Sequence, residues 1–197
     1  MKDNNTDIII CLVGESGSGK STIAELLEKE GYNYIKSYTT RKPRYKGERG
    51  HIFLDSINDG NDIDILDNGY YPKENVIAYT CYKDEHYYAT KEQYKNKGTS
   101  IYIVEVKGVN ELRSEIDDAE ILVLYLKADE QVRKGRMIKR YIDVNGNTSN
   151  NYLIAEQKAQ ERIVHDKENF QIIPCDYVID ANMLISEVLK SIKTIIE

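Results

Sequence analysis

One short segment of the sequence has the residue types and spacing needed to bind a nucleoside triphosphate. Residues 14–21 read Gly-Glu-Ser-Gly-Ser-Gly-Lys-Ser, which matches the phosphate-loop pattern G-x-x-x-x-G-K-[ST]. The glycines let backbone N–H groups turn towards phosphate oxygens, the lysine adds a full positive charge, and the last hydroxyl is a ligand for Mg²⁺. We therefore expect ATP and Mg²⁺ to be bound by Gly14, Glu15, Ser16, Gly17, Ser18, Gly19, Lys20, Ser21 and Thr22.

The loop is expected to lie between a buried strand and a helix. Residues 8–13 are a continuous apolar run with β-branched members, typical of a strand covered on both faces of a parallel sheet. Residues 22–30 have helical apolar spacing and are followed by Gly31, a common helix terminator. The start of such a helix offers free N–H groups and a positive dipole end to bound phosphate. This context favours a nucleotide site over a glycine-rich turn without function.

Strands and helices alternate along the rest of the chain, which predicts an α/β fold with a parallel sheet and helices on both faces. Further strands are expected at 32–37, 51–54, 76–82, 100–106, 121–127 and 177–179. Further helices are expected at 90–97, 109–116, 130–141 with Asp129 as N-cap, 152–169 and 183–196. The polar segments 55–75 and 143–151 are expected to be irregular, and the second of them flexible.

A second anion site is indicated by Ser37, Arg41 and Arg44, which lie in a loop made more rigid by Pro43. Guanidinium groups bind phosphate in a two-pronged geometry, so this cluster suits the terminal phosphate of a monophosphate. A solvated charge run is the alternative, and the phosphate loop upstream makes it the weaker one.

These two motifs, followed by Tyr87-Tyr88-Ala89-Thr90, resemble the guanylate kinase family of phosphate-loop nucleoside monophosphate kinases in order and spacing. The resemblance implies transfer of a phosphoryl group from ATP to GMP or dGMP. It also implies one kinase domain over residues 1–197, with residues 37–90 as the monophosphate-binding insertion and about 133–162 as a lid. In that family the equivalents of Ser37, Arg41, Arg44 and Tyr88 hold the acceptor phosphate.

Two departures from the family affect phosphate contacts. His51 stands where the family usually has a tyrosine, and Thr90 replaces a serine but keeps a hydroxyl. The residues expected in the monophosphate site are Ser37, Arg41, Arg44, His51, Thr80, Tyr88, Thr90 and Glu105.

A third departure concerns the base. Ala78 aligns with a family glutamate that reads the N1–H and 2-amino group of guanine, and alanine accepts no hydrogen bond. Thr80, Asp84 or Glu85 could compensate, and Glu105 keeps the second guanine-side carboxylate. A kinase for a different nucleoside or deoxynucleoside monophosphate is therefore the alternative to a GMP kinase.

Candidate groups for metal binding and for a lid complete the site. Glu105 follows an apolar strand, where a carboxylate can hold Mg²⁺ through water, so Ser21 and Glu105 are the predicted metal ligands, although Glu105 could contact the base instead. Arginines spaced three and four apart share one helix face, and they resemble the lid arginines of these kinases. The expected catalytic residues are Lys20, Arg136, Arg140 and Arg162, with Arg133 ranked behind them. His165 and Asp166 are expected on the surface, because an attacking phosphate oxygen needs no general base.

Composition excludes several other functions. The net charge of −6 argues against a general nucleic-acid binder, and no apolar run reaches the roughly 20 residues that span a bilayer. Three scattered cysteines and a polar N-terminus favour a cytoplasmic location, with small-molecule nucleotides as partners and neither nucleic acid nor membrane. A GTPase switch is disfavoured because no guanine-reading Asn-Lys-x-Asp occurs. A non-catalytic phosphopeptide-binding module of the same family remains an alternative, although its phosphate loop is typically eroded and this one is intact.

Overall fold

The apolar run before the phosphate loop forms the central strand of a five-stranded parallel sheet. In the computed structural model, which describes residues 6–56, 63–66, 69–82 and 84–196, the strand order is β11-β10-β1-β9-β2. Side chains of β1 point alternately into the two faces of the sheet and are almost fully buried, which explains the uninterrupted apolar sequence. The bounds are β1 Asp7–Val13, β2 Asn33–Ile35, β9 Thr99–Ile103, β10 Ala119–Lys127 and β11 Tyr177–Asp180.

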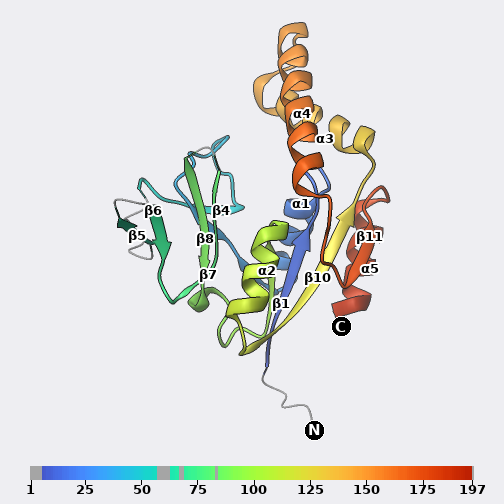
Figure 1. The fold of residues 1–197 in the computed structure, drawn as a ribbon. Coiled ribbons are helices and arrows are strands. Elements are labelled where there is room, and N and C mark those ends of the chain that lie inside the picture. The colour runs from blue at the N-terminus through green and yellow to red at the C-terminus, as the bar shows by residue number, and fades with distance from the viewer. Residues whose placement is uncertain (1–5, 57–62, 67–68, 83, 197) are drawn as a thin grey trace.

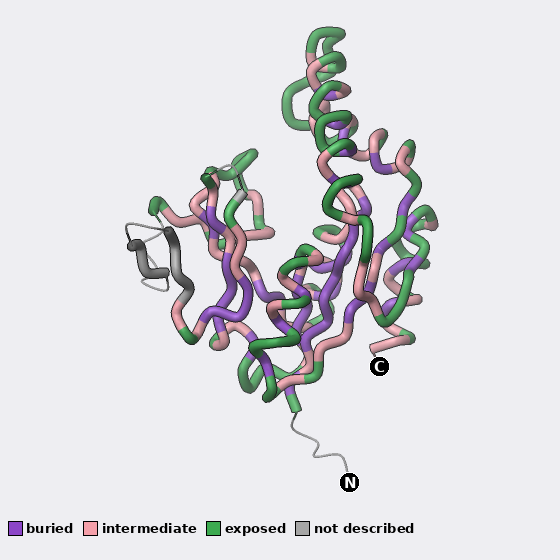
Figure 2. The backbone as a smooth tube through the Cα atoms, in the orientation of Figure 1, coloured by how far each residue is buried: buried purple, intermediate pink, exposed green. Residues whose placement is uncertain are grey.

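Helices cover both faces of this sheet (Figure 1). Ile9 and Cys11 of β1 pack with α2 on one face, whereas Ile10 and Leu12 pack with α1 and α5 on the other. Figure 2 shows the buried segments concentrated in the strands between these helices. The three helices are α1 Lys20–Lys29, α2 Val106–Glu115 and α5 Ile185–Ile196. The predicted α/β class, with a parallel sheet and helices on both faces, is confirmed.

A smaller four-stranded sheet, in the order β4-β3-β8-β7, lies apart from the first (Figure 1). It is inserted between β2 and β9, and a separate two-stranded hairpin, β5-β6, branches from it. The bounds are β3 Ser37–Thr39, β4 His51–Phe53, β5 Ile63–Leu66, β6 Gly69–Pro72, β7 Val76–Tyr82 and β8 Glu85–Thr90. The small insertion expected from the sequence is therefore present as a sheet of its own.

Two long helices, α3 Glu130–Asn145 and α4 Ser149–Asn169, form an antiparallel hairpin that projects beyond the sheet (Figure 1). Met137 of α3 and Ala159 and Ile163 of α4 form a small core between them, separate from the two cores of the main sheet. Because this contact is small, the outer part of the hairpin depends on the packing of only a few side chains.

The prediction of a flexible loop over residues 143–151 is wrong except at residues 146–148. Helix α3 continues to Asn145, Gly146 has a φ of 91° and ends it, and α4 already begins at Ser149. The Thr148 hydroxyl caps α4 by accepting a hydrogen bond from the N–H of Asn151 at 3.1 Å. The Asn, Ser, Thr and Gly residues of this segment therefore cap two helices. The same residue types also favour loops, so the sequence pattern did not distinguish the two.

The predicted helix at 90–97 is only a short 3-10 turn, Lys91–Gln93. The carboxylate of Asp7 accepts hydrogen bonds from the N–H groups of Asn96, Lys97 and Gly98, at 2.7–3.1 Å. These contacts hold the three residues in a turn. Because Asp7 is far from them in the sequence, the pattern of residues 90–97 alone does not predict this turn.

Three other segments differ from the sequence prediction. The strand expected at 32–37 is split into β2 and β3, which belong to different sheets. The segment 55–75 contains the β5-β6 hairpin, although residues 57–62 and 67–68 lie outside the described part. Strand β8, which carries the Tyr87-Tyr88-Ala89-Thr90 motif, was not predicted as a strand. Among the described residues, every helix is too short or too polar to cross a membrane.

Candidate active site

The phosphate loop connects the end of β1 at Val13 to the start of α1 at Lys20. Gly17 has a φ of 83°, and a Cβ there would lie 2.7 Å from the carbonyl oxygen of Arg133. A Cβ on Gly14 would lie 2.6 Å from the carbonyl oxygen of Leu126. Both positions therefore require glycine, because the loop is packed closely against β10 and α3.

Lys20 lies across the loop that it would serve. Its Nζ donates to the carbonyl oxygens of Gly14 and Glu15, at 2.5 and 3.0 Å, and lies 3.4 Å from the Ser18 hydroxyl. Burial lowers the pKa of Lys20 to about 8, while the nearby carboxylates of Asp166 and Glu15 act in the opposite direction. An incoming phosphate would supply the negative charge that favours the protonated ammonium.

The affinity for ATP is expected to fall as the pH rises above about 8. A bound triphosphate raises the pKa of Lys20, so the complex holds the proton more tightly than the free protein does. Binding is therefore strongest below the pKa of the free protein and weakens as the pH passes from that value towards the pKa of the complex. Calorimetric titrations in buffers of different ionisation enthalpy should detect proton uptake above this pKa. Lys20→Arg, which stays charged, should remove that uptake, and an uptake that persists in it would contradict the assignment to Lys20.

Behind the loop, a buried network ties it to the bases of α3 and α4. Asp166 was expected on the surface, but it is only 5% exposed. Its carboxylate accepts hydrogen bonds from the N–H of Ser16 at 2.7 Å, the Ser16 hydroxyl at 3.2 Å and the Arg133 guanidinium at 3.2 Å. Glu15 belongs to the same network: its carboxylate accepts from the Tyr125 hydroxyl at 3.0 Å and lies 3.8 Å from Arg133. Sequence reasoning missed this support, since its contacts join residues that are 33 to 150 positions apart in the chain.

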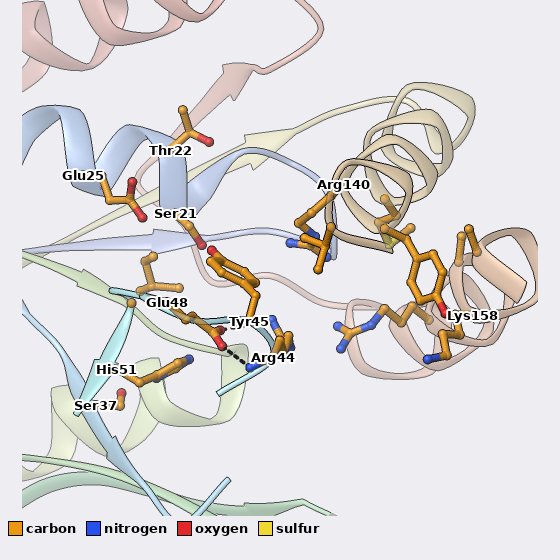
Figure 3. A pocket seen from close by; sticks show the side chains of 18 of the residues that line it. Ser21, Thr22, Glu25, Ser37, Arg44, Tyr45, Glu48, His51, Arg140 and Lys158 are labelled. Atoms are coloured by element: carbon orange, nitrogen blue, oxygen red, sulfur yellow. Dashed lines mark hydrogen bonds and ion pairs between the residues drawn. The ribbon is translucent and has the colours of Figure 1, made fainter. Parts of the chain in front are cut away.

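A cavity of about 1020 Å³ lies in front of the loop. Most residues of the phosphate loop line this cavity. It is also lined by these other residues that the sequence predicted for the site: Ser37, Arg41, Arg44, His51, Thr80, Glu105, Arg136, Arg140 and Arg162. A second cavity of about 660 Å³ shares several of these residues. Figure 3 shows Arg44, Glu48 and His51 on one side of it and Arg140 and Lys158 on the other.

Glu48 lies in the same loop as Arg41 and Arg44, and sequence reasoning missed it. Its carboxylate binds the Arg41 guanidinium through two hydrogen bonds, at 2.8 and 3.2 Å, and also accepts from the backbone N–H of Arg44 at 2.7 Å. The Arg41 Nε is buried and has no partner among the described residues. Glu48 thus holds the guanidinium fork in place and leaves one donor for another acceptor. Its place seven residues after Arg41, in the same loop, was the available signal.

Other predicted members of the acceptor site differ in accessibility. Burial and the Arg41 charge lower the pKa of His51 to about 4, so His51 is a neutral donor or acceptor at neutral pH. Tyr88 and Thr90 are each 1% exposed and line neither of the two cavities. Tyr88 stacks on Tyr38, with ring centroids 5.0 Å apart, and therefore supports the floor of the inserted sheet.

Arg41, Arg44, Arg140 and Arg162 line the same cavity. Burial and the charges of Arg41 and Arg162 lower the pKa of Arg44 to about 10, and burial and the charge of Arg162 lower the pKa of Arg140. Like charges gathered in a partly buried cleft repel each other unless an anion is present. The arrangement therefore favours a ligand with several negative charges.

The other two arginines predicted for a lid, Arg133 and Arg136, donate hydrogen bonds to backbone carbonyl oxygens. Arg136 donates to the carbonyl oxygen of Ala181 at 2.8 Å and lies 3.4 Å from those of Gly17 and Ser18. Arg133 is 4% exposed and belongs to the network behind the loop. Arg133 therefore ties the loop to the bases of α3 and α4.

The residues present fit a magnesium ion held mainly by nucleotide phosphates. The Ser21 hydroxyl and the Glu105 carboxylate line the same cavity, and Mg²⁺ prefers one or two such oxygen ligands together with phosphate oxygens and water. No cluster of three or more His, Cys, Asp or Glu side chains suited to a metal occurs in the described part of the chain. This donor set suits an ion that arrives with the nucleotide.

Comparison with solved structures identifies the fold. Guanylate kinase from Anaplasma phagocytophilum is similar over 98% of this chain and 86% of its own, with 17% sequence identity and a TM-score of 0.58. A second structure, that of APE1195, is similar over 98% of both chains at 18% identity, with a TM-score of 0.46 that supports no argument. No protein-family model and no curated protein matches the sequence. The chain therefore has a guanylate kinase-like fold, and the predicted resemblance is confirmed at that level.

Proposed function

We propose that this protein is a nucleoside monophosphate kinase that transfers the γ-phosphoryl group of ATP to GMP or dGMP. The observation that carries the proposal is one cavity that is lined both by the phosphate loop, all of it except Glu15, and by Arg41 and Arg44. A donor triphosphate and an acceptor phosphate bound at these two places would face each other. The guanylate kinase-like fold supports the same assignment.

The transfer needs positioning and charge stabilisation more than covalent chemistry. An oxygen of the acceptor phosphate forms a bond to the γ-phosphorus while the bond from that phosphorus to the β–γ bridging oxygen breaks, leaving ADP. Lys20 would bind the β- and γ-phosphates, and Arg41 and Arg44 would hold the acceptor. Mg²⁺, held by Ser21 and through water by Glu105, would neutralise charge on the phosphate oxygens. The helical hairpin of α3 and α4 would close over the cleft and exclude water.

A coupled assay that detects ADP tests this proposal directly. MgATP should be consumed with at least one monophosphate among GMP, dGMP, AMP, CMP and UMP, and only slowly without an acceptor. Absence of turnover with all five, together with binding of a phosphopeptide, would instead support the non-catalytic module. The intact Gly19, Lys20 and Ser21 favour the enzyme.

The second candidate function is a kinase that accepts a nucleoside monophosphate with a different base. The surroundings of Ala78 support this candidate. Ala78 is 6% exposed and lines the cavity near Thr80, Glu85 and Glu105. The Glu85 carboxylate already accepts a hydrogen bond from the Thr40 hydroxyl at 3.0 Å. Polar acceptors are therefore present in the cavity, but Ala78, the residue that the resemblance aligns with the family glutamate, supplies none.

Ala78→Glu is expected to sharpen the preference for GMP. One charged hydrogen-bond partner is worth roughly 1.5–3 kcal/mol, which is about one to two decades in discrimination. The natural protein should therefore favour GMP over AMP less strongly than the Ala78→Glu variant does. Values of kcat/KM for the five monophosphates on both proteins measure this. Strict GMP selectivity in the natural protein would show that Thr80, Glu85 or another residue has replaced the glutamate.

A further inference from the structure

Asp166 is a buried carboxylate to which the proposed reaction gives no role. It lies on α4, fourth from the end of that helix, and its side-chain hydrogen bonds lead to the phosphate loop and to α3. His165 of α4 lies farther away, with Nδ1 4.0 Å from Oδ1 of Asp166. Oδ2 accepts from the Ser16 N–H and from Arg133, and Oδ1 accepts from the Ser16 hydroxyl. A buried carboxylate is costly unless it is paired, and this one is fully paired. The three contacts form a clamp between the base of the hairpin and the loop.

Arg162 lies one helical turn before Asp166, and residues four apart share a helix face. Its Nη1 is 3.5 Å from the same Ser16 hydroxyl that Asp166 binds. Ser16 is therefore the point at which the loop meets both side chains. Because a helix is stiff over one turn, the clamp at Asp166 sets how far along the loop, and at what angle, Arg162 is presented to the cavity.

The second half of the clamp comes from α3. Arg133 donates to the carbonyl oxygens of Ala128 and Ser16, at 3.2 and 3.3 Å, as well as to Asp166. Both helices of the hairpin are thus attached to the loop at their bases, while their outer ends extend away from the sheet (Figure 1). A swing of the outer ends about this base would leave Arg162 beside the loop.

We infer that Asp166 is a positioning residue, which clamps α4 to Ser16 and so places Arg162 over the phosphoryl group that is transferred. The inference rests on the proposed kinase function. Asp166 itself neither contacts substrate nor transfers a proton. Arg133 balances its charge, and Arg162 acts on the reacting atoms.

The test is a double-mutant cycle on kcat with Asp166→Asn, Arg162→Ala and the variant carrying both. Asp166→Asn removes the charge and one of the acceptors, so kcat should fall by roughly tenfold to a hundredfold, with the KM of the monophosphate little changed. In the Arg162→Ala background the same substitution should have almost no further effect, because the residue through which it acts is gone. Asp166→Glu, which keeps the charge, should recover part of the rate. Losses that multiply in the cycle would overturn the inference.

Asp7 provides a matched control. It is also a buried carboxylate, 9% exposed, that accepts several hydrogen bonds, and it lies at the other end of β1 from the loop. Asp7→Asn should lower the melting temperature and leave kcat unchanged. If Asp166→Asn behaves in the same way, Asp166 is only structural. If Asp166→Asn fails to fold, Ser16→Ala in the same cycle decides the question, because it removes the hydroxyl that both side chains contact.

Failure of the proposed function would be recognised separately, by a natural protein that turns over none of the monophosphates. Hydrogen exchange then tests the clamp without activity. In Asp166→Asn, amides of residues 14–19 and 149–169 should exchange faster than in the natural protein, whereas Asp7→Asn should leave them unchanged. Equal exchange in both variants would overturn the clamp itself.

Discussion

Lys20→Ala is expected to lower kcat by roughly 10²–10³ while leaving the fold intact. Lys20 is the one charged group of the phosphate loop that points across it, with Nζ 2.5 and 3.0 Å from two loop carbonyl oxygens. A charge aimed at the β- and γ-phosphates stabilises the transition state more than the ground state, since charge shifts onto the bridging oxygen as the bond breaks. Initial rates in the ADP-coupled assay at saturating MgATP measure the loss.

Lys29→Ala is the matched control for this substitution. Lys29 lies in the last turn of the same helix, is exposed, and lines neither of the two cavities. Its replacement should change neither kcat nor the melting temperature. A Lys20→Ala protein that retains the full rate would rule out the proposed mechanism, whereas a Lys20→Ala protein that unfolds would show that the two loop carbonyls depend on the ammonium for stability.

The phosphate loop was predictable because every feature that defines it is local. The glycines, the lysine, the preceding apolar strand and the following helix all lie within residues 8–30, and β1 and α1 occupy these places. The loop that carries Arg41 and Arg44 was selected for the same reason, and its role in binding the acceptor phosphate stays a prediction. Glu48 lies in that loop too. It was not predicted, because phosphate binding calls for cations, whereas Glu48 is the carboxylate that orients them.

The network behind the loop was not predictable, because its contacts join distant parts of the chain. Ser16 and Asp166 are 150 residues apart, and only the parallel order of β1 and β10 brings the base of the hairpin to the loop. Within α4, nothing in the sequence separates Asp166 from the other charged residues of a polar helix. The turn held by Asp7 near residues 96–98 failed to be predicted for the same reason: a carboxylate about 90 residues earlier supplies its hydrogen bonds.

For the arginines of α3, the sequence predicts that they share a helix face, but it does not show which guanidinium is held by other groups. Arg136 and Arg140 share a face, and both line the large cavity. Arg136, however, donates to the backbone carbonyl of Ala181 and lies near two carbonyls of the loop. For the Arg140 guanidinium, no hydrogen-bond or ion-pair partner is present among the residues that the structure describes. Burial, and then the charge of Arg162, lower the pKa of Arg140, and the Glu48 carboxylate acts in the opposite direction without reversing that shift.

Arg140→Ala is therefore expected to cause the largest loss of rate among the lid arginines. The phosphoryl group carries negative charge spread over its oxygens in the transition state, and one well-placed arginine contributes roughly 10³–10⁵ in rate, or about 4–7 kcal/mol. We expect kcat to fall by about 10³ in Arg140→Ala, at the lower limit of that range, because Arg162 remains. Single-turnover rates with both nucleotides saturating separate this loss from slower product release.

Arg136→Ala should behave differently, because its guanidinium supports backbone. Its main effects should be weaker ATP binding and a lower melting temperature, with a smaller loss of kcat. Lys139→Ala is the matched control on the same helix: its side chain is 75% exposed and, among the residues that the structure describes, pairs with Asp143 alone, so its loss should change neither quantity. A larger kcat loss in Arg136→Ala than in Arg140→Ala, at unchanged stability and ATP affinity, would reverse the ranking. In that case the contacts of Arg136 with Gly17, Ser18 and Ala181 would break when the nucleotides bind, which would free its guanidinium for the transferred phosphoryl group.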